Sequence, residues 1–196
     1  MKVAGEYTFD ASPQEVWDGL MNPDVLAATM PGCERLELVG QDQYEGELNI
    51  KVGPVQGKFK GRIEVENIDA PSSYDMKVDG QGAQGFVRAT AHVTIAAAEG
   101  RTRMTYEGDA QVGGRIASVG QRLMDSSAKA IIKQSLEGLN ARLGAGAAAV
   151  APAAPPSQAQ FAAQVAKEVA KDLVPRPVWI GLAVLVALLV LYLILR

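Results

Sequence analysis

The sequence predicts an α+β protein in which a strongly curved antiparallel sheet wraps around one long helix. Two observations lead to this prediction. About eighty residues after Cys33 alternate between apolar and polar side chains and are interrupted by short turns, as in an antiparallel meander. One strand and two short helical segments precede this region, and a long amphipathic helical pattern follows it. This order of elements describes a helix-grip fold.

The N-terminal elements are predicted by alternation and by helix-start signals. Lys2–Phe9 alternates as a strand does. Ser12 is expected to cap a helix, with Pro13 in its first turn and Glu15 three residues after the cap. A second short helix is expected after Pro23, and the Pro-Gly pair that follows should end it.

Six strands are expected in the alternating region, over residues 34–39, 43–52, 57–68, 74–80, 86–97 and 102–112. Glycine, proline and small polar residues separate them, as in tight turns. Each strand has one apolar and one charged face, which is typical of a sheet that covers a core on one side. The apolar face is formed by Leu48, Ile50, Val52, Phe59, Gly61, Ile63, Val65, Tyr74, Met76, Val78, Val87, Ala89, Ala91, Val93, Ile95, Met104, Tyr106, Gly108 and Ala110.

Residues 115–143 predict a single long helix after the glycine pair that ends the last strand. Its apolar side chains recur at helical spacing from Ile116 to Leu143, so they should cover the apolar face of the sheet. Three small residues, Gly120, Ser127 and Ala130, interrupt this apolar stripe.

Small side chains also occupy the middle of the sheet's apolar face. Because voids cost stability, small residues on both facing layers predict either close approach or a cavity. A strongly curved sheet cannot lie close to a helix along its whole length, which favours a cavity. A simply well-packed core is the alternative. Tyr106 would be a polar group in an otherwise apolar cavity. The predicted lining consists of Phe59, Ile63, Met76, Ala89, Ala91, Met104, Tyr106, Leu123, Met124 and Ser127.

The sequence offers few residues for catalysis, and we expect no catalytic site. His92 is the only histidine, and its strand position places it on the outer, charged face. Cys33 is the only cysteine; it could be a reactive thiol, but a small buried hydrophobic residue is the favoured interpretation. No metal-ligand spacing is present, and no serine lies in a nucleophile-elbow pattern.

The glycine-rich stretches at 53–57 and 80–85 lack the lysine and the following helix of a phosphate-binding loop. We interpret them as flexible loops at the mouth of the cavity, with ordinary hairpin turns as the alternative. The net charge is −3, and lysines and arginines are scattered singly. This distribution gives no basic surface for nucleic acid, so we expect no nucleic acid partner.

Residues 178–195 are uncharged, contain no proline and are apolar on all sides, whereas a core helix usually keeps a polar stripe. As a helix they would be roughly 27 Å long, close to the thickness of a bilayer's hydrocarbon core. Trp179 and Tyr192 lie near the two ends, as interfacial aromatic residues do. This stretch predicts a single-pass C-terminal anchor in a bacterial cell membrane. More basic residues precede it than follow it, which predicts a cytoplasmic N-terminal domain.

Between the predicted helix-grip domain, residues 1–143, and this anchor lie two further segments. Residues 144–160 are rich in alanine and proline and predict a flexible linker. Residues 161–174 return to helical spacing. They predict either an ordinary juxtamembrane helix or an amphipathic helix on the membrane surface.

Four groups of residues give the chain a resemblance to a known family. They are MPGCE at 30–34, KVGPVQGKF at 51–59, the glycines and phenylalanine at 80–86, and GGRIASVGQRL at 113–123. In combination they resemble the CoxG family of carbon monoxide dehydrogenase subunits, a group in the START-like (SRPBCC, polyketide-cyclase-like) superfamily. The resemblance covers residues 1–143 and implies a START/Bet v 1-like helix-grip fold.

The resemblance also implies a function. It implies a non-catalytic accessory protein that recruits a molybdenum CO dehydrogenase, or a related molybdenum hydroxylase, to the membrane. Its cavity could accept a respiratory quinone such as menaquinone, which would be a bound ligand and not a covalent cofactor. We therefore expect a tethered carrier of a lipid-soluble electron acceptor. Two alternatives stay open: a pure docking anchor with a packed interior, and an enzyme of the polyketide cyclase or aromatase type.

Overall fold

The computed structural model describes residues 1–144; the predicted linker, the segment 161–174 and the predicted membrane span lie outside the described residues. The elements are β1 (Lys2–Phe9), α1 (Pro13–Met21), α2 (Pro23–Thr29), β2 (Cys33–Gly40), β3 (Gln43–Val52), β4 (Val55–Asp69), β5 (Ser73–Gly82), β6 (Gly85–Ala98), β7 (Arg101–Gly113), the 3-10 helix η1 (Arg115–Val119) and α3 (Gln121–Gly144).

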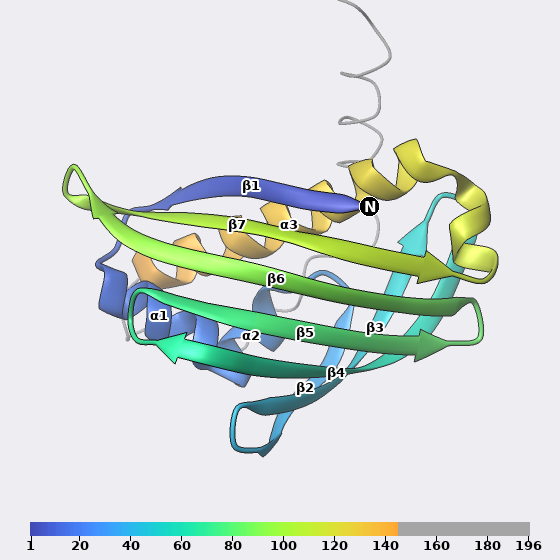
Figure 1. Cartoon of the computed structure of the whole chain (residues 1–196), viewed down its shortest axis with the longest axis horizontal. Helices are drawn as coiled ribbons and strands as arrows, with labels where there is room; N and C mark the ends of the chain where they lie inside the picture. The colour runs from blue at the N-terminus through green and yellow to red at the C-terminus, as the bar shows by residue number, and fades with distance from the viewer. Residues whose placement is uncertain (145–196) are drawn as a thin grey trace, which may run out of the picture.

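The strands form one antiparallel sheet in the order β1-β7-β6-β5-β4-β3-β2. Strands β2 to β7 follow each other as hairpins, and β1 pairs with β7, from Lys2 opposite Asp109 to Phe9 opposite Thr102. The sheet is curved, and α3 runs along the same face as α1 and α2 (Figure 1). The predicted α+β class, with an antiparallel sheet around a C-terminal helix, is therefore confirmed for residues 1–144.

The prediction of one continuous helix over residues 115–143 is wrong. Arg115–Val119 forms a 3-10 helix, Gly120 has a φ of 89°, and α3 begins only at Gln121. A positive φ ends a right-handed helix, and glycine adopts it without the steric cost that other residues have. The glycine inside the helical pattern therefore marks a real break between η1 and α3.

The glycine-rich stretches form hairpins, as the simpler interpretation predicted. Gly53 and Pro54 make a two-residue turn between β3 and β4, with a φ of 56° at Gly53. The predicted break at 80–85 is too long, because β5 continues to Gly82 and the turn consists of residues 83–84 alone. Backbone pairing with β4 and β6 keeps these glycines in the sheet.

Packing inside the domain is concentrated at its ends. The largest cluster joins α1, the sheet and the C-terminal half of α3; Trp17 meets Tyr74 edge-on, with ring centroids 5.7 Å apart. A second cluster lies where Val52 and Phe59 meet Ile116 of η1. The main cluster contains Phe9, Val16, Trp17, Tyr74, Val93, Ile95, Met104, Leu136 and Leu139.

The start of α1 is held by the predicted reciprocal cap. The Glu15 backbone N–H donates to Ser12 Oγ at 3.3 Å, and the Ser12 backbone N–H donates to Glu15 Oε2 at 2.8 Å. The Ser12 hydroxyl also donates to Glu15 Oε2, at 2.7 Å, and this bond together with that from the Ser12 backbone N–H lowers the pKa of the Glu15 carboxyl below its usual 4.5. Two N–H groups that a helix end would leave unpaired are thereby satisfied.

Ser12→Ala should lower the free energy of unfolding by about 1 kcal/mol at neutral pH, because an alanine cannot cap the helix. Since the pKa of Glu15 is lowered in the folded state, its contribution is present above pH 4.5 and is lost as the pH falls through the folded pKa. The free energies of unfolding of the variant and the wild type should therefore differ less in acid than at neutral pH. Urea unfolding at pH 7 and in acid measures both values; an equal difference at both pH values would contradict the role given to Glu15.

Candidate functional site

The inner face of the sheet, on the side of α3, carries all the predicted lining residues that belong to strands. Burial alternates along β4 to β7, with charged residues outside and apolar residues inside. The strand residues of the predicted lining are Phe59, Ile63, Met76, Ala89, Ala91, Met104 and Tyr106. Their shared orientation follows from the two-residue period of a strand.

The structure divides these residues between several packed groups. Phe59 is buried with Val52 and Ile116, and Leu123 of α3 packs against them. Met104 belongs to the main core cluster, against which Met76 and Tyr106 pack. Ile63 packs instead near Cys33, in a third cluster. The predicted lining is thus not one uniform wall but two well-packed ends and a middle.

The middle of the inner face is less well covered than its ends. Five strand residues there, and Met124 of α3, are only half-buried, and none packs against a core cluster formed by the described residues. Inward-facing apolar side chains in a close-packed interior would normally be fully buried. The inner face therefore retains accessible apolar surface between its two packed ends. The six residues are Val78, Val87, Ala89, Ala91, Ala110 and Met124.

Tyr106 is a half-buried residue of the inner face, and its hydroxyl group lies over Gly5 of β1. It lies opposite Gly5 in the β1–β7 pairing, and a Cβ at position 5 would collide with its phenol ring. Its hydroxyl has no hydrogen-bond partner among the described residues. Burial raises the pKa of Tyr106 above its usual 10, so the phenol stays protonated near neutral pH and can donate a hydrogen bond.

Ser127, the remaining predicted lining residue, is buried on α3, and its Oγ has no hydrogen-bond partner among the described residues. The interpretation of Cys33 as a buried hydrophobic residue is confirmed: it packs with Leu36 and Tyr44, and burial raises the pKa of its thiol. A raised pKa lowers the fraction of the nucleophilic thiolate.

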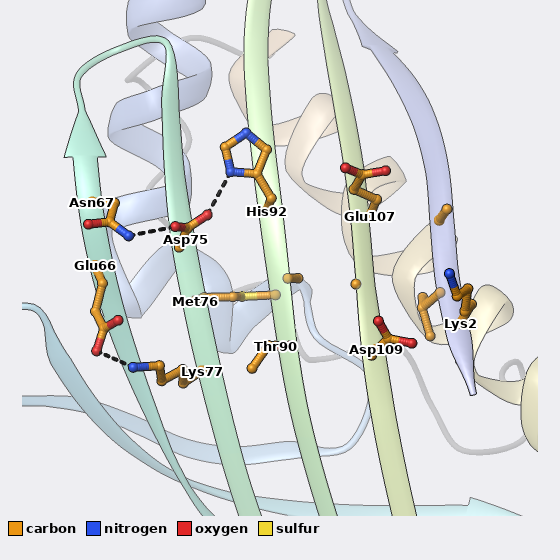
Figure 2. Close-up of a pocket in the computed structure, with 14 residues that line it drawn as sticks. Lys2, Glu66, Asn67, Asp75, Met76, Lys77, Thr90, His92, Glu107 and Asp109 are labelled. Carbon is orange, nitrogen blue, oxygen red and sulfur yellow. Dashed lines mark hydrogen bonds and ion pairs between the residues drawn. The ribbon is translucent and has the colours of Figure 1, made fainter.

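The outer face of the sheet contains a hollow that the sequence alone does not predict. Its volume is about 630 Å³, and it crosses β4 to β7 and β1. Figure 2 shows the charged side chains around it, with Asp75 between Asn67 and His92, and with Lys77 reaching Glu66. Short outward residues, Thr90 and Ala4, leave the space open. Such neighbours across strands become visible only once the pairing is known.

Two hydrogen bonds hold the Asp75 carboxylate in this hollow. Asn67 Nδ2 donates to Asp75 Oδ2 at 2.7 Å, and His92 Nδ1 lies 2.6 Å from Asp75 Oδ1. These bonds, that from Asn67 first, lower the pKa of the Asp75 carboxyl below its usual 3.8. His92 is exposed, as predicted. A polar, solvent-exposed hollow of this kind is unsuited to an apolar ligand.

Among residues 1–144, no group of three or more His, Cys, Asp or Glu side chains is placed to hold a metal ion. Within the same residues, no helix combines the length and the apolar character needed to cross a bilayer.

Comparison with known proteins identifies the fold and the family. The family model for CoxG, a subunit of carbon monoxide dehydrogenase, matches residues 5–144. A crystal structure of a conserved protein from Geobacillus kaustophilus is similar at 33% identity and a TM-score of 0.71, over 74% of this chain and 96% of that chain. No curated protein matches the chain.

More distant structures share the fold alone. A START superfamily protein from Mycobacterium smegmatis has 12% identity and a TM-score of 0.57, over 74% of this chain and 97% of its own. A protein from Arthrobacter aurescens has 21% identity and a TM-score of 0.53, over 74% of this chain and 87% of its own. These similarities show that residues 1–144 adopt a START-like fold.

Proposed function

Because the chain belongs to the CoxG family of carbon monoxide dehydrogenase subunits, we propose that it carries a respiratory quinone, such as menaquinone, for a molybdenum CO dehydrogenase or a related hydroxylase. The family name implies association with carbon monoxide dehydrogenase. The START-like fold is consistent with a hydrophobic ligand held between sheet and helix. The protein would then link the enzyme to the electron acceptors of the membrane.

The half-buried centre of the inner face is the observation that carries this proposal. Its small side chains, such as Ala89 and Ala110, stay only half-buried, while both ends of the domain are packed. A flat apolar ring system would cover this accessible surface and gain the free energy of its burial. The outer hollow offers charged groups instead, so it does not suit such a ring.

Tyr106 gives the inner face a means of orienting a quinone. A quinone ring is apolar except for its two carbonyl oxygens, which accept hydrogen bonds. The protonated, unpartnered phenol of Tyr106 can supply one donor at the edge of the apolar surface. One donor among apolar neighbours is the arrangement expected for a small-molecule site that binds an apolar ring in one orientation.

The C-terminal residues would place this carrier beside its ligand. We propose that residues 178–195 span the bacterial cell membrane and that the N-terminal domain is cytoplasmic. The linker of residues 144–160 would have a root-mean-square length of roughly 20 Å if flexible. Tethering of this kind raises the local concentration of both the quinone and a docked enzyme.

We propose that the protein has no catalytic activity of its own. A cyclase or aromatase would need an acid–base group beside its substrate, and His92 points away from the inner face. Turnover of a polyketide substrate by the purified chain, without a partner enzyme, would overturn this part of the proposal.

Lipid extraction and titration test quinone carriage directly. The full chain, purified in detergent, should release quinone into organic solvent, and the delipidated protein should rebind menaquinone with saturation near one per chain. Protein with neither bound lipid nor measurable menaquinone binding would leave a pure docking anchor as the better description.

Tyr106→Phe should weaken menaquinone binding by about three- to tenfold, the usual effect of losing one hydrogen bond. Tyr44→Phe is the matched control, because the Tyr44 hydroxyl donates to the Met21 carbonyl at 3.2 Å. This control should affect stability and leave binding unchanged. Fluorescence titration with menaquinone measures the affinity of both variants and of the wild type. Equal affinity for wild type and Tyr106→Phe would contradict the role of the phenol.

A further inference from the structure

Two polar residues lie on the side of α3 that faces into the domain. Ser127 and Gln134 share this side with Leu123 and Gly138, because the four positions recur at helical spacing. Leu123 packs against the cluster formed by β3, β4 and η1. Further along the helix, a Cβ at Gly138 would lie 3.2 Å from a side chain of α2. The stretch of α3 between these two contacts is therefore turned toward the inside of the curved sheet.

Ser127 and Gln134 are buried there with unpaired polar atoms. Their exposed fractions are 2% and 9%, and neither Ser127 Oγ nor Gln134 Oε1 has a hydrogen-bond partner among the described residues. Buried polar atoms in proteins are normally hydrogen-bonded. Ala130 lies between them, and the described hydrophobic side chains that pack against it, Leu123 and Ile131, both belong to α3. The hydrophobic side chains of the described strands thus leave this stretch of α3 uncovered.

The part of the sheet opposite this stretch contains a pair of glycines. On the inner face of β4, Gly61 lies between Phe59, which packs in the same cluster as Leu123, and Ile63, which packs in the same cluster as α2. Gly80 of β5 is paired with Gly61 in the register of the sheet. Because Leu123 and α2 also mark the two ends of the polar stretch of α3, the glycine pair lies across from that stretch.

Both glycines leave space in front of the sheet. Among the described atoms, a Cβ on Gly61 or Gly80 would meet only the backbone of neighbouring strands, at 3.5 Å or more. By contrast, a Cβ on Gly108, which is also on the inner face, would collide with the backbone of Thr90. A glycine inside a strand often marks a place where a ligand approaches the backbone closely. A flat ring can therefore lie on the glycine pair with its polar atoms toward α3.

We propose that this space holds the reduced form of the carried ring, a quinol, and that Ser127 and Gln134 accept hydrogen bonds from its hydroxyl groups. This inference rests on the proposed carriage of a quinone. Reduction of a quinone by two electrons from the partner dehydrogenase, with uptake of two protons, converts its two carbonyl groups into hydroxyl groups, which donate hydrogen bonds. Gln134 Oε1 can only accept a hydrogen bond, and the Ser127 hydroxyl can accept one as well. A quinone has no donor for these atoms, whereas a quinol has two.

The oxidised ring would lie at a different place on the inner face. The Tyr106 hydroxyl, which donates, lies over Gly5 of β1, and β1 is four strands away from Gly61 of β4. That separation is roughly 19 Å along the sheet, too far for one ring to contact both places. The apolar tail of either form would cover the half-buried centre between them, so one chain would hold one form at a time. A carrier that delivers a quinone and removes the quinol needs to hold both forms.

Gln134→Leu should weaken the binding of a short-tailed menaquinol by about three- to tenfold, because leucine has a similar size but no acceptor. Ser127→Ala should have the same effect. In both variants the affinity for the oxidised menaquinone should stay within about twofold of the wild type. Isothermal titration calorimetry of the full chain in detergent, under nitrogen and with dithionite for the reduced form, measures both affinities.

Ser126→Ala is the matched control. Ser126 is buried on the same helix, but its hydroxyl donates to the Arg122 carbonyl at 2.9 Å, so both affinities should be unchanged. If Gln134→Leu and Ser127→Ala weaken the binding of neither form, water satisfies their polar atoms and the quinol position is wrong. Equal weakening of both forms would also overturn it, because the position would not distinguish them. A wild type that binds neither form would overturn quinone carriage itself, and the quinol position with it.

Gly61→Val tests the glycine pair separately. Valine is favoured in strands, and its Cβ would meet no described side chain within 4 Å, so the variant should fold, as circular dichroism checks. Its side chain would occupy the place of the ring and should weaken menaquinol binding by about tenfold or more. Lys60→Val, at the adjacent but exposed position, is the control and should bind menaquinol normally. Unchanged menaquinol affinity in Gly61→Val would show that the ring does not lie on the glycine pair.

Discussion

Ala89→Trp should reduce menaquinone binding by roughly 100-fold or more, which corresponds to about 2.7 kcal/mol of binding free energy. Ala89 faces inward from the middle of β6, between Val78 of β5 and Ala110 of β7. An indole at this position would occupy the space that the ligand needs. Ala89 is preferred to Ala91, because Ala91 already lies close to the backbone of Gly108, which leaves less room.

Stability distinguishes an open space from a packed one. If the centre of the inner face is open, Ala89→Trp should leave the free energy of unfolding unchanged or raise it, because the ring fills accessible apolar space. If the interior is fully packed, as in a pure anchor, the same change should cost about 1–3 kcal/mol through overpacking. Urea unfolding of wild type and variant, both without lipid, separates the two cases.

Thr90→Trp is the matched control, with the same ring on the same strand but on the opposite face. Thr90 lies in the outer hollow, beside Lys77 and Asp109. The proposal expects normal menaquinone binding in this variant. Lost binding in Thr90→Trp together with normal binding in Ala89→Trp would move the ligand to the outer hollow and contradict the inner site.

The strands and their faces could be predicted from sequence because they depend on local chemistry. A two-residue period of apolar and charged residues defines each face, and glycine, proline or small polar residues define each turn. The same local reasoning failed at Gly120. There the helical spacing of apolar residues continues on both sides of a break, and one backbone angle, a φ of 89°, interrupts the helix. Side-chain periodicity contains no information about that angle.

The site was predicted less completely because packing is not local. Met104 and Ala89 both face inward, as their parity predicts, yet Met104 is in the main core and Ala89 is only half-buried. What separates them is the position of α1 and of the C-terminal half of α3, which cover one end of the sheet. The outer hollow was missed for a related reason, since it needs β1 beside β7.

Val186→Arg combined with Leu189→Arg should move the full chain from the membrane to the soluble fraction. Both positions lie near the middle of residues 178–195. One arginine at the centre of a membrane helix costs about 2.5–3.5 kcal/mol, and the apolar residue that it replaces contributed about 0.5 kcal/mol. The double change therefore costs about 6–8 kcal/mol, which is larger than any other effect predicted for this chain.

Ultracentrifugation of cell lysates, with immunoblotting of pellet and supernatant, measures the shift. The matched control places the same two charges in the predicted linker, as Ala147→Arg with Ala154→Arg, and should leave the protein in the pellet. Membrane-associated protein in the double-arginine variant would mean that the domain itself, or a bound partner, provides the attachment. If the anchor acts as proposed, the soluble variant should still bind menaquinone in detergent, because the inner face is unchanged. It should fail to take menaquinone from membranes, because the tether no longer holds the domain beside them.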